Sequence, residues 1–157
     1  MNKAILPGIL ILALSAPMAS ARARKLNAKF DRADIDNDNQ LTTLEFQATQ
    51  SKRVSVAYSL FRFQKTDTND DNFVSLEEFL ASRGGITGGK PTRLELYLLA
   101  DADENELLDP EEYADTLKPK LAWPKALKAF DKRDKDDNGE LTTREFGIRQ
   151  GGFPFPF

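Results

Sequence analysis

Acidic segments flanked by apolar residues recur along this chain about every 33 residues. Four acidic segments begin at Asp34, Asp67, Asp101 and Asp134, at intervals of 33, 34 and 33 residues. One aromatic residue stands four positions before each segment and another follows its closing glutamate. These eight residues are Phe30, Phe46, Phe63, Phe79, Tyr97, Tyr113, Phe130 and Phe146. A fixed period of this kind indicates internal repeats, each forming one supersecondary unit.

The flanks of each acidic segment carry apolar residues at helical spacing, and they predict two helices for every repeat. Pro110 and Pro124 suit the first turn of a helix, where the missing N–H has no helical partner. We expect the eight aromatic residues to pack in the core. The helices before the segments are predicted at 23–34, 54–66, 92–100 and 124–132, and those after them at 43–51, 76–83, 110–117 and 143–150. The predicted fold class is therefore all-α.

The four acidic segments share one spacing of oxygen-bearing side chains. Each opens with Asp, has Asp or Asn at its third and fifth positions, and closes with Glu at its twelfth. The eighth position is always aliphatic: Leu41, Val74, Leu108 or Leu141. Carboxylates held this close together repel one another unless a cation lies among them. Because Ca²⁺ takes six to eight oxygens at about 2.3–2.6 Å, the spacing predicts a hard cation in each segment.

This pattern resembles the EF-hand family, in which a 12-residue calcium loop lies between two helices. The resemblance covers nearly all of the chain after the first 21 residues. It implies four helix–loop–helix units arranged as two paired lobes, with loops at 34–45, 67–78, 101–112 and 134–145. It also implies that the eighth-position residues pair between neighbouring loops, Leu41 with Val74 and Leu108 with Leu141.

The resemblance implies a ligand set for up to four Ca²⁺ ions, with side chains at positions one, three, five and twelve and a backbone carbonyl at position seven. Ninth-position Thr42, Ser75, Asp109 and Thr142 would act directly or through a water. The implied metal ligands are Asp34, Asp36, Asp38, Gln40 and Glu45; Asp67, Asn69, Asp71, Phe73 and Glu78; Asp101, Asp103, Asn105, Leu107, Asp109 and Glu112; and Asp134, Asp136, Asn138, Glu140 and Glu145.

The sixth loop position departs from the family pattern in three repeats. Glycine is usual there because the loop turns sharply with positive φ, and only Gly139 meets that requirement. Asn39 and Asn72 tolerate a left-handed conformation, whereas Glu106 is less suited to it. We therefore expect the third site to be the weakest or the most divergent.

The first 21 residues have the composition of an export signal. Lys3 precedes an apolar run, and Ala19, Ser20 and Ala21 supply the small residues that favour cleavage near Ala21. The apolar run is shorter than the ~20 residues of a membrane span and holds a Pro-Gly pair. We expect an exported protein, periplasmic or extracellular, with no membrane span in the mature chain.

The remaining chain divides into two EF-hand pairs and a tail. The pairs occupy residues 22–83 and 92–150, and the glycine-rich segment 84–91 between them is the predicted linker. In the tail, residues 151–157, proline alternates with phenylalanine and favours an extended shape. Its apolar anchors are Phe153, Phe155 and Phe157.

Composition excludes several other functions. The formal net charge is −3, which argues against a nucleic-acid partner, since such a protein needs a basic face. The chain has no cysteine and no histidine, so neither a zinc site nor a Cys-His or Ser-His pair is expected. No phosphate-binding loop or nucleophile motif occurs in it, and we expect no enzyme activity.

Three functions fit these observations. The first is an exported calcium-binding protein that buffers calcium or is stabilised by it, since a Met-lined sensor groove is disfavoured when both methionines precede residue 22. The second is a calcium-dependent regulatory or interaction subunit, which contacts a protein partner through the Phe tail or an interlobe groove. The third is a lanthanide-binding protein resembling lanmodulin. That family, however, has closer-set hands and proline at the second loop position. The corresponding residues of this chain are Ile35, Thr68, Ala102 and Lys135.

Overall fold

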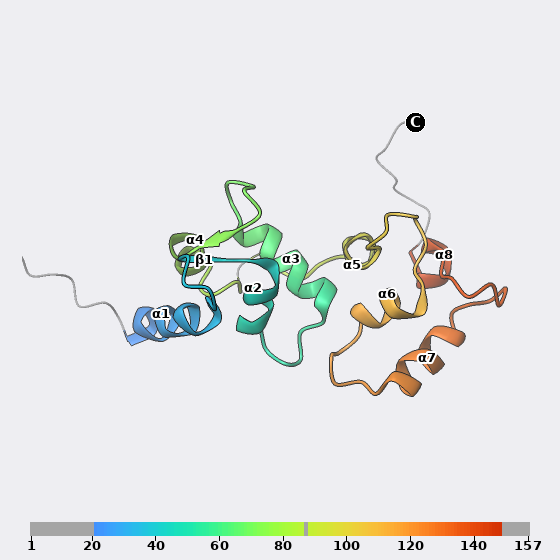
Figure 1. Cartoon of the computed structure of the whole chain (residues 1–157). Helices are drawn as coiled ribbons and strands as arrows, with labels where there is room; N and C mark the ends of the chain where they lie inside the picture. Colours follow the sequence, from blue (N-terminus) through green and yellow to red (C-terminus); the bar gives the residue numbers. More distant parts are fainter. Residues whose placement is uncertain (1–20, 87, 149–157) are drawn as a thin grey trace, which may run out of the picture.

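The computed structural model describes residues 21–86 and 88–148, and most regular elements in this part of the chain are helices, joined by loops (Figure 1). One two-stranded antiparallel sheet joins the first two loops. The elements are α1 (Ala21–Ala33), β1 (Gln40–Leu41), α2 (Thr43–Thr49), α3 (Val56–Thr66), β2 (Val74–Ser75), α4 (Leu76–Ala81), α5 (Arg93–Ala100), α6 (Pro110–Asp115), α7 (Trp123–Asp131) and α8 (Thr143–Phe146). Among the described residues, no helix is both long and apolar enough to span a membrane. The predicted all-α, EF-hand type of fold is confirmed.

Most helices begin where the sequence predicts, because local capping groups fix their first turns. The predicted helix over 143–150 ends instead at Phe146, where Gly147 adopts a left-handed conformation with φ 91° and closes the last turn. Pro110 lies at the start of α6 and Pro124 in the first turn of α7, as expected. The predicted signal and the Phe tail lie outside the described residues.

The helices gather into two groups, α1–α4 and α5–α8, each around its own apolar cluster (Figure 1). All eight repeated aromatic residues are buried, which confirms their predicted core role. They meet mostly edge to face, an arrangement that ring quadrupoles favour. Phe46 and Phe63 lie 5.5 Å apart between ring centroids in the first group, and Tyr97 and Phe146 lie 5.4 Å apart in the second.

In each group the two loops are paired by backbone hydrogen bonds. Leu41 pairs with Val74 in the β1–β2 ladder, and Leu108 forms an antiparallel bridge with Leu141. All four side chains are fully buried. The predicted pairing of the eighth loop positions is therefore confirmed.

The two groups are not separate bodies, because α3 of the first packs against α5 of the second. Ala57, near the start of α3, is completely buried and belongs to the apolar cluster of the second group. The Tyr58 hydroxyl donates a hydrogen bond to the Gly89 carbonyl at 3.2 Å. The glycine-rich segment also begins in close contact with the first group: a methyl group on Gly85, whose φ is 74°, would collide with the Phe46 ring. The lobes thus dock, a point that the sequence left open.

Candidate metal centres

Each loop leads directly into a helix, and the same two residues end the loop and start the helix. The ninth residue is the N-cap and the twelfth, a glutamate, is the third helical residue. Its carboxylate accepts the N-cap N–H while its own N–H donates to the N-cap side chain, which forms a capping box in all four loops. The capping box holds the closing glutamate facing back toward its loop.

The other oxygen of each closing glutamate binds the far end of the loop. In the first loop, Glu45 Oε1 accepts the Ile35 N–H at 2.8 Å and its Oε2 accepts the Thr42 N–H at 2.9 Å. The remaining loops repeat both contacts at 2.8–3.0 Å. Each glutamate therefore clamps position two to position nine, and it is held ready to close a metal site.

The first aspartate of each loop organises the opposite side. Asp34 Oδ1 accepts the Asp38 N–H at 3.2 Å and Oδ2 accepts the Asn39 N–H at 3.0 Å, and the other three loops have equivalent bonds. These first aspartates are only 7–9% exposed. These hydrogen bonds hold the buried carboxylates pointing into the loop.

The loop backbone turns with positive φ at two positions. At the sixth position φ is 66° for Asn39 and Asn72, 67° for Glu106 and 86° for Gly139, as the sequence analysis expected. The fourth position is also left-handed, at 55–60°, in Asn37, Asp70, Glu104 and Asp137. That second turn was missed, although Asn or Asp at three of the four positions is a signal for it.

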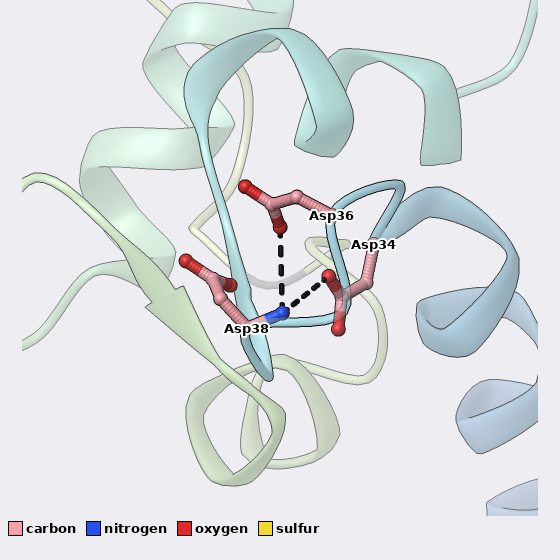
Figure 2. Close-up of side chains that lie close together, drawn as sticks. All are labelled: Asp34, Asp36 and Asp38. Atoms are coloured by element: carbon pink, nitrogen blue, oxygen red, sulfur yellow. Dashed lines mark hydrogen bonds between the residues drawn. The ribbon is translucent and has the colours of Figure 1, made fainter.

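Carboxylate oxygens converge in three of the four loops. Figure 2 shows Asp34, Asp36 and Asp38 of the first loop pointing toward one shared region. In each of these loops the ligand atoms lie within 4.8 Å of one another; the groups are Asp34, Asp36 and Asp38; Asp101, Asp103 and Glu112; and Asp134, Asp136 and Glu145. Two oxygens on opposite sides of a Ca²⁺ ion are about 4.6–5.2 Å apart, given Ca–O distances of about 2.3–2.6 Å. The donor type and the spacing therefore fit calcium.

The second loop has the same backbone network but a different arrangement of charge. Among the described residues, its acids do not form such a three-carboxylate group. Its third residue is Asn69, whose amide donates to Asp71 Oδ2 at 2.8 Å, so this side chain engages its neighbour. In the third loop, Asp109 accepts the Glu111 and Glu112 N–H groups as the N-cap of α6 and is not part of the acidic group.

The carboxyl pKa is lowered at Glu78, which closes the second loop, and raised at Asp36, in the middle of the first loop's acidic group. Burial would raise the pKa of Glu78, but hydrogen bonds from Thr68 and Ser75 outweigh it and lower that pKa to about 2. Its contribution to stability is thus present above its ordinary pKa of 4.5 and is lost as the pH falls toward 2. Asp36 behaves in the opposite way: desolvation, and then the charges of Asp38 and Glu45, raise its pKa. A cation in the loop would remove that repulsion.

Tyr97 links the third and fourth loops, and sequence reasoning treated it only as a core residue. Its hydroxyl lies 2.6 Å from the Glu106 carbonyl and 2.9 Å from the Leu141 carbonyl, and it can donate to either. Burial, and then the charges of Asp101 and Glu112, raise the pKa of Tyr97 to about 12, so the hydroxyl keeps its proton. The equivalent residue is phenylalanine in the other three hands, which was the available signal.

Replacing Tyr97 with Phe should lower the free energy of unfolding by about 1–2 kcal/mol, because buried carbonyls lose a hydrogen-bond donor while the ring remains. Urea denaturation followed by circular dichroism measures this. Tyr58→Phe is the control, since its hydroxyl bonds an exposed carbonyl and its loss should cost less. Equal stability of Tyr97→Phe and the unmodified protein would show that the contact contributes nothing.

Comparison with known proteins agrees with this geometry in the first half of the chain. The family model described as EF hand matches residues 26–48 and 62–81, which include the first two loops and parts of their flanking helices. No curated protein matches the chain.

Several solved structures are similar to it at low identity. Caltubin from the great pond snail is 18% identical, with 79% of this chain and 93% of that one covered and a TM-score of 0.40. A redox protein from Chlamydomonas reinhardtii is 21% identical, with 85% of this chain and 49% of that one covered and a TM-score of 0.36. A homologue of programmed cell death 6 protein from Leishmania major Friedlin is 19% identical, with 80% of this chain and 74% of that one covered and a TM-score of 0.34. Likenesses this distant carry no argument. The family match over residues 26–48 and 62–81 and the loop geometry together support an EF-hand, calcium-binding type of fold.

Proposed function

We propose that this protein is exported and binds calcium in four loops, as a buffer or as a module that calcium stabilises. The observation that carries the proposal is the fourfold recurrence of one loop network. In every loop the first aspartate accepts the N–H of position six, and the closing glutamate accepts the N–H of position two. Export rests on the composition of residues 1–21. In this proposal the protein acts by binding ions and not by catalysis.

Isothermal titration of the protein lacking residues 1–21 tests the metal and its stoichiometry. We expect heat from calcium binding with up to four ions per chain and a much weaker response to magnesium, which demands a tighter octahedral shell. A lanthanide arm tests the third function proposed above. Tight lanthanide binding together with no calcium binding at millimolar concentration would assign the loops to trivalent ions instead.

Glu106→Gly should tighten the third site about tenfold, because relief of a left-handed non-glycine residue is worth about 1–2 kcal/mol. The φ of 67° at Glu106 supplies the strain. The same titration measures the change, and Asn39→Gly is the control, since asparagine tolerates this conformation and should gain less. Unchanged affinity in Glu106→Gly would contradict the strain argument.

A calcium-dependent regulatory role is the second candidate, and one observation favours it. A hollow of about 250 Å³ lies where α3 meets the second group, lined by Val56 together with Leu117, Leu121, Trp123 and Ala126. Asp115 and Lys118 also line it, and in this proposal the hollow serves as the interlobe contact. The Phe tail, as a second contact, lies outside the described residues. Capture of one partner from the native compartment in calcium, and its release by chelator, would support this role over simple buffering.

A further inference from the structure

The segment that follows α6 and includes most of α7 is basic, as residues 22–30 and 51–66 also are, and Asp115 and Asp131 flank it. Residues 116–130 contain four lysines (Lys118, Lys120, Lys125 and Lys128) and no acidic residue. The whole chain has 22 basic and 25 acidic side chains, so the remainder has 18 and 25, a net charge of −7 against +4 for this segment. Among the described residues, none of these lysines forms an ion pair with a carboxylate. Their charge is therefore available to a partner.

The same segment exposes large apolar side chains. Residues 118–125 are all exposed, and Leu121, Trp123 and Leu127 retain 39%, 47% and 37% of their surface. Ala126 and Phe130 are buried, and Trp123 and Leu127, three or four residues from them along α7, lie beside them at the edge of the buried face. We call residues 118–128 the Lys–Trp surface. The loop from α6 into α7 lies on the side of the second group that faces α3, whose Val56 lines one hollow with Leu121 and Trp123 (Figure 1).

We propose that the Lys–Trp surface binds anionic lipid headgroups at a bilayer surface. Lysines attract the negative surface of a membrane, while tryptophan and leucine enter the boundary between headgroups and acyl chains. Leu121 and Trp123 stand at the rim of the 250 Å³ hollow and remain exposed, so their apolar surface is open to this boundary layer. This inference goes beyond metal binding and does not depend on it.

Trp123 is the only tryptophan of the protein, so its fluorescence reports directly on this surface. The full mature chain is mixed with vesicles of phosphatidylcholine and phosphatidylglycerol, and with vesicles of phosphatidylcholine alone, in calcium and in EDTA. We expect co-sedimentation and a blue shift of Trp123 only with the anionic vesicles, and release at high salt. Calcium should strengthen binding by reducing the repulsion from the acidic loops.

The variant Lys120→Gln, Lys125→Gln, Lys128→Gln should bind about a hundredfold more weakly, at roughly fivefold per lysine. Leu121→Ser should reduce the blue shift. The matched controls, Lys52→Gln and Leu44→Ser, are exposed in the first group and should bind as the unmodified protein does. Melting curves of all variants check that folding is intact.

Three outcomes would overturn the proposal. Equal binding to the two kinds of vesicle would remove the role of headgroup charge. If EDTA abolished vesicle binding while the lysine variant still bound in calcium, the binding would come from calcium bridges between the acidic loops and the headgroups. Lysine-dependent binding to polyglutamate without any vesicle binding would assign the surface to an acidic protein partner.

Discussion

Removal of calcium should lower the melting temperature of the protein by about 10–20 °C. A ligand that binds only the folded state at 100 times its Kd stabilises that state by about 2.7 kcal/mol per site. If two of the four proposed sites are filled to that extent, they contribute roughly 5 kcal/mol, and a chain of this size shifts by about 2–4 °C per kcal/mol. Calorimetry in calcium and in EDTA measures the difference.

Two glutamate variants separate the metal from helix capping. Glu145 and Glu95 each complete a capping box, with Thr142 and Thr92, and hydrogen bonds lower the pKa of both carboxyls. Only Glu145 belongs to a loop with a three-carboxylate group. Glu145→Gln should therefore lose part of the calcium-dependent gain, whereas Glu95→Gln should keep all of it. If both variants lost the same part, or if EDTA left the melting temperature unchanged, calcium would not be stabilising the fold through these loops.

Ala57→Glu should lower the free energy of unfolding by about 3–5 kcal/mol and separate the two groups of helices. Ala57 is completely buried in the core of the second group, so a carboxylate there would be a buried charge without a partner. Glutamate suits the first turn of a helix, and the loss therefore cannot come from helix propensity. Urea denaturation gives the energy, and solution scattering gives the change in radius of gyration.

Ala48→Glu is the matched control, since Ala48 lies exposed on α2 and the same change there should cost less than about 0.5 kcal/mol. If Ala57→Glu unfolded as the control does, with the same radius of gyration, the contact between α3 and the second group would be unimportant in solution. Two separate unfolding transitions in Ala57→Glu would show that this contact normally makes the groups unfold together.

Much of the candidate site could be predicted because its contacts are local in sequence. The first aspartate of a loop binds N–H groups four and five residues later, and the capping glutamate binds one three residues earlier. Such contacts need only the right residue at the right spacing. The predicted helices and the pairing of Leu41 with Val74 follow the same repeat and are confirmed. The count of ions, the linker boundary and the export signal stay predictions.

The helix–loop–helix repeat, the oxygen-rich loops and the aromatic core follow from spacing within about 16 residues, so they can be read from the chain before it folds. Three other features depend on how distant segments pack: Ala57 enters the core of the second group, the Tyr97 hydroxyl reaches Leu141 across 44 positions, and Gly85 lies against Phe46. A small residue, one hydroxyl and a glycine leave no periodic signal. Their roles depend on which surfaces meet after the helices have formed, and that is set by the packing of the whole chain.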